Sequence, residues 1–176
     1  PYPAELIETA AWQGQTLTLR PVRPEDEAQH RAFLESLDPD DIRLRLFYTR
    51  RHMERSELAR MVQIDYTREM AFIATAPDPE GREQTLGVAR ALADPDNTEA
   101  EFGIIVRHEL KGTGLGHLLM DKLIRYFRAA GTREMTAVVL KENRAMRELG
   151  RALGFVDHPS PDDPDIRLLT LALQAP

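Results

Sequence analysis

The stretch TEAEFGIIVRHELKGTGLGHLLM, residues 98–120, decides the fold. Its first part alternates with a two-residue period, which is typical of a strand whose one face carries Ala100, Phe102, Ile104 and Val106. A loop with glycines at 112, 114 and 116 follows. Apolar residues then recur at helical spacing until Gly131, which is a typical helix stop. The stretch therefore predicts a strand, a glycine-rich loop and an amphipathic helix in direct succession.

The glycine loop favours a phosphate-binding interpretation. The first N–H groups of a helix have no intrahelical acceptor, and glycines allow a phosphate to approach them closely. A tight strand-to-helix turn without a ligand is the competing interpretation. A Walker loop would need its lysine after the glycines, whereas Lys111 precedes them. A dinucleotide-binding GxGxxG would follow the first buried strand of a parallel sheet, and this loop comes late in the chain.

The sequence on either side predicts an α+β domain. Further strands are predicted over 16–22, 68–76, 84–93, 134–140 and 166–173, and helices over 23–37, around 40–48, over 54–63 and over 143–154. Residues 157–165 read as a polar loop broken by prolines. We expect a mixed, mostly antiparallel central sheet flanked by helices, with residues 16–176 as one domain and 1–15 as the linker remnant of an upstream domain.

Composition excludes several classes of function. The chain of 176 residues has no cysteine, which rules out disulfides, thiolate metal sites and a cysteine nucleophile and fits a cytoplasmic location. A formal net charge of −6 argues against a nucleic-acid surface, and no apolar run is long enough to span a membrane. The five histidines lack metal-binding spacing, so we expect no metal site.

The segment VRHELKGTGLGHLLM resembles the loop motif of the GNAT acetyltransferase superfamily, in which a strand-end Val precedes [QR]-x-x-G-x-[GA] at a helix start. Lys111 stands where Gln or Arg is usual and keeps the positive charge. The resemblance covers almost the whole chain and implies the GNAT acyl-CoA N-acyltransferase fold with acetyl-CoA as the acyl donor. It implies that the donor's pantetheine arm pairs with the strand at 102–106 and that the pyrophosphate rests on the loop at 112–117. The expected coenzyme A contacts are Phe102, Ile104, Ile105, Val106, Lys111, Gly112, Thr113, Gly114, Leu115, Gly116, His117, Asn143 and Arg147.

Some of these residues also have a purely structural interpretation. Asn143 has the position and chemistry of a helix cap. Arg107, Lys111 and His117 are candidates for the CoA phosphates, but a solvated charged rim would explain them equally well.

Glu101 is the candidate catalytic base. Carboxylates are depleted in strand interiors, and Glu101 shares a face with Glu99 close to the expected donor. A neighbouring carboxylate and partial burial would make it a base suited to a protonated amine. The alternative interpretation is an ordinary exposed glutamate without a catalytic role. Glu99 is the fallback, and His108 is a third candidate. Without cysteine the transfer is expected to be direct, with a backbone N–H near residue 104 or 105 stabilising the oxyanion.

A departure from the family pattern limits the mechanism. The later motif of the superfamily, N-x-x-A-x-x-L-Y-x-K-x-G-F, is NRAMRELGRALGF here, and Gly150 stands where many relatives have a tyrosine that protonates the leaving thiolate. No side chain for that role is carried over, so water or the proton of the amine is expected to serve. A non-catalytic acetyl-CoA-binding regulatory module is therefore one alternative function.

The segments RPVRPEDE, QIDYTREMAFIA, GVARALADPDNTEAEFGIIV, LKGTGLG and ENRAM together are similar to the C-terminal acetyltransferase domain of bacterial protein lysine acetyltransferases. In those enzymes an ADP-forming acyl-CoA-synthetase-like region precedes the domain. The resemblance implies acetylation of lysine on metabolic enzymes such as acyl-CoA synthetases, with Glu101 as the catalytic glutamate. Acetylation of a small amine is the other alternative.

Overall fold

The computed structural model describes residues 1–46 and 55–176. In this part of the chain the strands are β1 (Glu8–Trp12), β2 (Gln15–Pro21), β3 (Glu69–Pro77), β4 (Glu83–Ala93), β5 (Glu99–Val106), β6 (Glu134–Leu140), β7 (Val156–Pro159) and β8 (Ile166–Ala172). The α-helices are α1 (Glu27–Glu35), α2 (Pro39–Leu46), α3 (Arg55–Val62), α4 (Leu115–Ala129) and α5 (Arg144–Ala152). The predicted helices and strands all occur, with ends that differ by a few residues; positions 47, 48 and 54 of the helix predictions lie outside the described residues.

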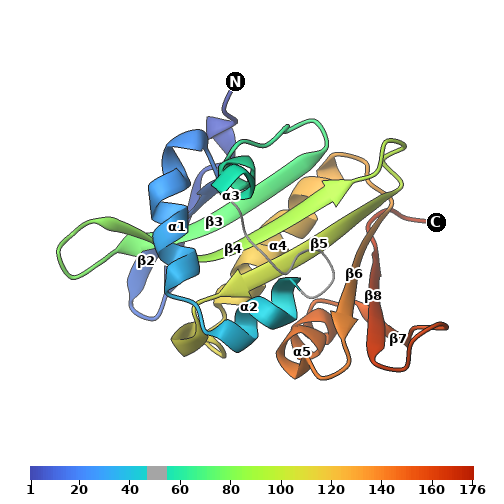
Figure 1. The fold of residues 1–176 in the computed structure, drawn as a ribbon. Helices are drawn as coiled ribbons and strands as arrows, with labels where there is room; N and C mark the ends of the chain where they lie inside the picture. Colours follow the sequence, from blue (N-terminus) through green and yellow to red (C-terminus); the bar gives the residue numbers. More distant parts are fainter. Residues whose placement is uncertain (47–54) are drawn as a thin grey trace.

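The described strands form one mixed sheet in the order β1-β2-β3-β4-β5-β6-β8-β7. Every neighbouring pair is antiparallel except β5 and β6, which run parallel with α4 as their crossover. Figure 1 shows α1, α2 and α3 in front of the sheet and α4 behind it. The predicted α+β architecture, a mostly antiparallel sheet flanked by helices, is confirmed.

Each face of the sheet has its own hydrophobic core. The larger core lies under α4 and α5, where Leu115, Leu119 and Leu123 of α4 are fully buried. The smaller core lies under α1 and α3 and contains Phe33 and Val62. Because β4 has buried side chains on both faces, this central strand is fixed from two sides, and β5 is fixed by the buried side chains of its α4 face. The sheet is therefore a firm support for the residues at the ends of its strands.

The expectation of a linker at residues 1–15 is wrong for residues 8–12. These residues form β1, which pairs with β2 at the edge of the sheet, and Trp12 is buried. Glu8 also accepts a hydrogen bond from Nζ of the buried Lys122, at 2.9 Å. The pattern ETAAW has only one large side chain, so its pairing could not be read from periodicity. The folded domain therefore begins before residue 16.

The predicted loop at 157–165 is also partly a strand. Residues 156–159 form β7 and pair with β8, and the loop is confined to the residues that follow. Asp157 anchors this hairpin because its carboxylate accepts hydrogen bonds from Arg147, Arg151 and Arg167. Burial alone would raise the pKa of Asp157, but these hydrogen bonds outweigh it and lower the pKa to about 2.

Among the described residues, no helix is long and apolar enough to cross a membrane.

Candidate functional site

The site begins where two neighbouring strands separate. β5 pairs with β6 only from Glu99 to Glu101, and Glu101 faces Thr136 at the last paired position. On its other side β5 stays paired with β4 as far as Val106. Residues 102–106 therefore keep one backbone edge directed away from β4 that β6 does not cover. An extended ligand chain can add to such an edge as a further strand would.

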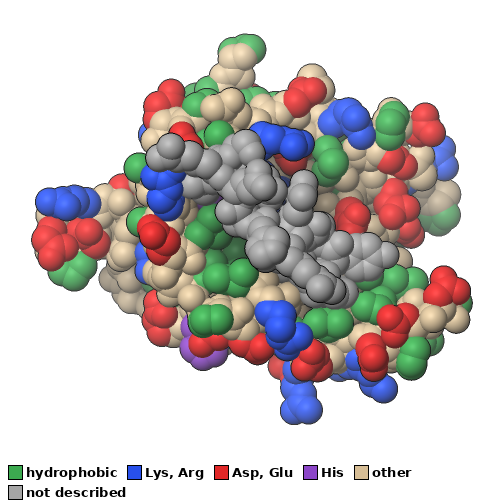
Figure 2. Space-filling model, in the orientation of Figure 1, with side chains coloured by type: hydrophobic (Ala, Val, Ile, Leu, Met, Phe, Trp, Pro, Cys, Tyr) green, Lys and Arg blue, Asp and Glu red, His purple; other side chains and the backbone are tan. Residues whose placement is uncertain are grey.

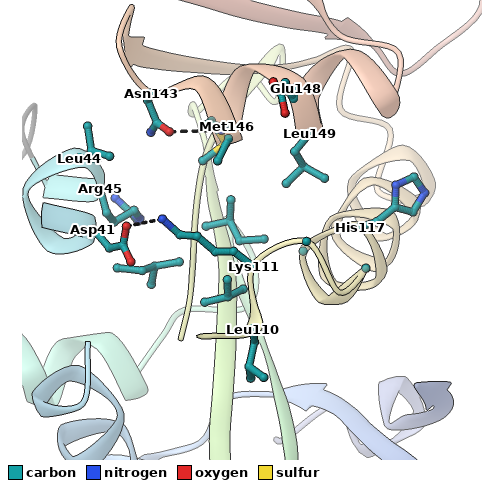
Figure 3. A pocket seen from close by; sticks show the side chains of 17 residues that line it. Asp41, Leu44, Arg45, Leu110, Lys111, His117, Asn143, Met146, Glu148 and Leu149 are labelled. Atoms are coloured by element: carbon teal, nitrogen blue, oxygen red, sulfur yellow. Dashed lines mark hydrogen bonds and ion pairs between the residues drawn. The ribbon is translucent and has the colours of Figure 1, made fainter. Parts of the chain in front are cut away.

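A cavity of about 380 Å³ opens beside this uncovered edge (Figure 3). Its walls come from α2, from β5, from the loop before α4 and from the start of α5. Nine of the expected coenzyme A contacts line it: Ile104, Ile105, Val106, Lys111, Gly112, Gly114, Gly116, His117 and Asn143. The structure thus brings together most of the residues that the sequence marked as contacts of one ligand.

The loop has the geometry of an anion cradle. Gly112 and Gly114 have φ angles of +76° and +88°, a left-handed conformation that favours glycine. A Cβ at either position would meet no atom within 4 Å, so the space above the loop is open. Gly114 is the N-cap of α4, whose first N–H groups, from Leu115 to His117, have no acceptor inside the helix. Open space in front of such groups fits the diphosphate of coenzyme A.

Gly116 allows close packing rather than an unusual backbone conformation. A Cβ there would lie 3.3 Å from Leu149 of α5 and 3.6 Å from Ile104 of β5. The absence of a side chain lets α4, α5 and β5 meet at the inner end of the cavity. The three glycines therefore have two separate functions in the same loop.

Four expected contacts do not line the cavity. Phe102 is buried against Phe155, with ring centroids 5.1 Å apart, and Leu115 is fully buried in the core. Thr113 is held by the protein itself, because its hydroxyl donates to Leu110 and its carbonyl accepts from Nε1 of Trp12 at 3.0 Å. Arg147, the fourth, donates to Asp157 as described above. These residues support the cavity from outside.

Asp41 of α2 is a site residue that the sequence analysis missed. It is 6% exposed and lines the cavity, and its carboxylate forms an ion pair with Nζ of Lys111. Nδ1 of His108 lies 3.0 Å from its other oxygen. Asp41 thus ties α2 to the loop before α4 and holds Lys111 at the cavity (Figure 3). Only its place in an acidic first helical turn could be seen in the sequence, and such residues are common.

Asn143 is both a helix cap and part of the cavity wall. Its side-chain oxygen caps α5 by accepting a hydrogen bond from the backbone N–H of Met146 at 3.2 Å, and the residue also lines the cavity. The cap fixes the start of α5, and with it Met146 and Leu149 on the cavity wall.

Glu101 lies at the point of separation of β5 and β6, and its surroundings differ from those expected. The residue is exposed, so the expectation of partial burial is wrong. Its side chain is on the α2 side of the sheet, and the residue does not line the cavity. Glu99 is exposed as well and accepts a hydrogen bond from the hydroxyl of Thr136 at 3.0 Å. His108 is held by Asp41 at the far end of β5.

Arg45 of α2 is the second residue that the sequence analysis missed. It lines the cavity, and its guanidinium packs against Gly103 of β5. Burial, together with the nearby positive charge of Arg90, lowers the pKa of Arg45 to about 10, although Glu101 acts in the opposite direction. A cation is therefore present between the cavity and the base candidate.

Gly150 does not face the cavity. A Cβ at this position would lie 3.1 Å from Leu169 of β8 and 3.6 Å from Phe155. The glycine lets α5 pack closely on the sheet. A larger side chain at residue 150 would therefore have to displace core residues before it could reach a ligand.

Within residues 1–46 and 55–176 no cluster of three or more His, Cys, Asp or Glu side chains has an arrangement that could hold a metal ion.

Comparisons with known proteins agree with this geometry. Residues 16–156 match the family model described as "Acetyltransferase (GNAT) domain". A curated protein of Pseudomonas aeruginosa, acetyltransferase PA5475, is 33% identical over 160 residues, which cover 91% of this chain and 86% of that protein.

Two solved structures have the same fold. The GNAT domain of S. lividans PAT superposes with a TM-score of 0.85 at 20% identity, over 98% of this chain and 99% of that one. The spermidine N-acetyltransferase of Vibrio cholerae, in complex with CoA and spermine, has a TM-score of 0.67 at 20% identity, over 89% of this chain and 95% of that one.

Proposed function

The chain belongs to the GNAT acetyltransferase family, and we propose that it transfers the acetyl group of acetyl-CoA to the ε-amine of lysine on another protein. The observation that carries the proposal is the position of Glu101. This carboxylate is exposed on the α2 side of the sheet, at the residue where β5 leaves β6. The side chain of a lysine on a partner's surface can reach such a carboxylate without entering an enclosed pocket.

We propose that coenzyme A lies along the uncovered edge of β5. The diphosphate would accept hydrogen bonds from N–H groups of the loop at 112–117, with Lys111 as a nearby cation, and the pantetheine arm would follow residues 102–106. The four residue steps from Val106 to Phe102 span about 13 Å at roughly 3.3 Å per residue. A pantetheine arm that follows the strand over this length brings its thioester end next to Glu101. The donor supplies an activated acetyl group as its thioester.

In this proposal Glu101 accepts the proton that the lysine ammonium must lose, directly or through a water molecule. The free amine then forms the amide bond as the carbon–sulfur bond breaks, and the sulfur keeps the electron pair of that bond. A backbone N–H near Ile104 or Ile105 would stabilise the oxyanion. Gly150 offers no hydroxyl. The thiolate would therefore be protonated by water, or by the proton that the amine releases as the amide forms.

The finer parts of the proposal come from the sequence resemblance to bacterial protein lysine acetyltransferases. They are an acyl-CoA synthetase as the target, a cytoplasmic location, and an upstream region resembling ADP-forming acyl-CoA synthetases. The likeness to the GNAT domain of S. lividans PAT, which covers nearly all of both chains, is consistent with that family.

A small polyamine is the second candidate acceptor. The fold is also that of a spermidine N-acetyltransferase, and Glu99, Glu101 and Glu134 lie near one another at the start of β5 and β6. Several carboxylates close together suit an acceptor with several amines. The exposed position of Glu101 favours the protein substrate.

The test measures thiol release from acetyl-CoA with either an acyl-CoA synthetase or spermidine as the acceptor, followed by mass spectrometry of the product. Wild type should acetylate the synthetase on lysine at a rate well above that with spermidine. Glu101→Gln should lose at least about a hundredfold in rate, the range of general base catalysis. Glu99→Gln is the matched control and should keep most of the activity.

Two outcomes would contradict the proposal. If Glu101→Gln releases thiol as fast as wild type, Glu101 is not the base. If spermidine is the better acceptor by kcat/KM, the small-amine function replaces the protein substrate.

A further inference from the structure

The carboxylate of Asp41 lies where a negative charge opposes the proposed ligand. Asp41 lines the cavity and is 6% exposed, so solvent screens its charge only weakly. In our proposal the diphosphate of coenzyme A lies on the loop at 112–117, whose residues line the same cavity. Two anions that face one cavity repel each other unless a cation lies between them. The placement of such a cation therefore decides how strongly the ligand binds.

Lys111 is the cation that both anions can reach. Its ammonium forms an ion pair with Oδ1 of Asp41, and the residue directly precedes Gly112 in the loop. Figure 3 shows the side chain of Lys111 extended from the loop toward Asp41 of α2. A lysine carries its charge on a flexible stem with rotatable donors, so its ammonium can move from one acceptor to another. The same ammonium can pair with the carboxylate in the free protein and with the diphosphate in the complex.

Asp41 keeps a second partner when Lys111 turns away. Nδ1 of His108 lies 3.0 Å from Oδ2, which is the carboxylate oxygen that Lys111 does not contact. Breaking a buried pair is costly mainly because one charged group is left without a partner. A hydrogen bond from His108 avoids that outcome, so the ammonium of Lys111 can be exchanged.

Other contacts hold α2 at the cavity without Lys111. Nη1 of Arg43 donates to Glu142, which lies shortly before α5, at 3.0 Å. The guanidinium of Arg45 packs against Gly103 of β5. The helix thus stays attached on the α5 side and on the sheet when Lys111 leaves Asp41. The exchange requires only that one side chain turns.

We propose that Asp41 sets the affinity for the donor: its carboxylate competes with the diphosphate of coenzyme A for the ammonium of Lys111 and recaptures that ammonium when coenzyme A leaves. The inference rests on the proposed position of the diphosphate at the loop. The ion pair with Asp41 must be given up before Lys111 can neutralise the diphosphate, and this cost weakens binding. Because acetyl-CoA and the product coenzyme A share the diphosphate, the competition also favours release of the product.

The experiment measures the binding of acetyl-CoA and of coenzyme A by calorimetry. Asp41→Asn removes the competing charge and should lower both Kd values by about tenfold, the order expected for a hydrogen bond between charged groups. Dissociation of coenzyme A, followed by stopped flow, should become slower by a similar factor. The Tm of the free variant should fall, because a buried ion pair is lost. Asp41→Ser is a second variant with the same expected changes, so the test does not depend on one substitution.

Two control variants separate the competition from a general effect of charge. Asp40→Asn removes the same charge from the adjacent position of α2, where the side chain is 65% exposed and pairs with Arg43. Its Kd values should stay within about twofold of wild type, because solvent screens an exposed charge. In a Lys111→Met background, Asp41→Asn should lower Kd by no more than about threefold, because only direct repulsion of the diphosphate is then removed.

Three outcomes would overturn the inference. An unchanged or raised Kd in Asp41→Asn would mean that Asp41 holds Lys111 in place for the ligand or has a structural role only. Equal tightening in Asp40→Asn would indicate net charge as the cause. Equal tightening of Asp41→Asn with and without Lys111 would show that no ammonium is contested. Failure of the proposed diphosphate position is recognised separately, because adding Lys111→Met to Asp41→Asn would then leave Kd unchanged.

Discussion

Gly114→Ala should weaken acetyl-CoA binding strongly, whereas Gly81→Ala should not affect it. The two glycines have φ angles of +88° and +83°, and a Cβ at either position would meet nothing within 4 Å. Gly81 lies in the turn between β3 and β4, and Gly114 caps α4 at the cavity. An L-residue in this left-handed conformation costs roughly 1–2 kcal/mol, so both variants should be destabilised to a similar extent. For a chain of this size that corresponds to a fall in Tm of roughly 2–8 °C.

The affinity loss is specific to residue 114 because of what its methyl group would occupy. Gly114 lines the cavity as the N-cap of α4, directly before the N–H groups of Leu115, Gly116 and His117, where we place the diphosphate. A hydrogen bond to a charged group contributes about 1.5–3 kcal/mol, so the loss of one should raise Kd by roughly ten- to a hundredfold. Gly81→Ala should leave Kd unchanged within about twofold. Its backbone strain is the same as that of Gly114→Ala, but its methyl group lies away from the cavity.

The assay is calorimetric titration with acetyl-CoA, together with thermal unfolding of each variant without ligand. Equal destabilisation of the two variants with a weakened Kd only in Gly114→Ala would support the cradle. Equal Kd values in the two variants would refute the reasoning, because the loop would then not contact the diphosphate.

Three further predictions concern the surroundings of the site. Trp12 is the only tryptophan of the chain and donates to the carbonyl of Thr113, so titration with acetyl-CoA should change its fluorescence; an unchanged spectrum at saturation would mean that the loop does not respond to the ligand. Three arginines lower the pKa of Asp157 from 3.8 to about 2. The ionised carboxylate therefore stabilises the folded protein by about 2 kcal/mol above pH 4, and this contribution is lost as the pH falls through 2. Denaturant titrations should show this loss in wild type and not in Asp157→Asn, which should lack the same stabilisation at neutral pH. Gly150→Tyr should lower the free energy of unfolding by about 1–3 kcal/mol without raising kcat, because the side chain would meet Leu169 first; a faster enzyme would show that the tyrosine position still faces the thiolate.

The strand, loop and helix at 98–131 could be predicted because each depends on local sequence. The two-residue period of β5, the glycines and the helical spacing of α4 are contiguous signals, and the structure confirms all three. β1 was missed because its few apolar side chains are small, and its pairing with β2 follows from a turn at Gln13 and Gly14 that positions the strand.

The missed site residues have a different cause. Asp41 is 70 positions from Lys111, and Arg45 meets Gly103 only because the fold places α2 over β5. Neither contact leaves a periodic or motif-like signal in one sequence. Gly103 itself was assigned only to a face of β5, although its missing side chain is what admits the arginine. The same limitation led to the expectation that Glu101 is partly buried, since exposure depends on which elements cover the sheet.

The position of one strand explains why these parts act together. One edge of β5 is paired with β4 and gives the strand its rigidity, while the other edge leaves β6 after Glu101 and opens the cavity. Its α2 face carries Glu101 and receives Arg45, and its opposite face is fixed by the core under α4. A donor lying along the open edge and an acceptor arriving on the α2 face would therefore meet at the residue where the strands separate. Mutations that alter the separation of β5 and β6 should therefore affect donor binding and proton transfer together.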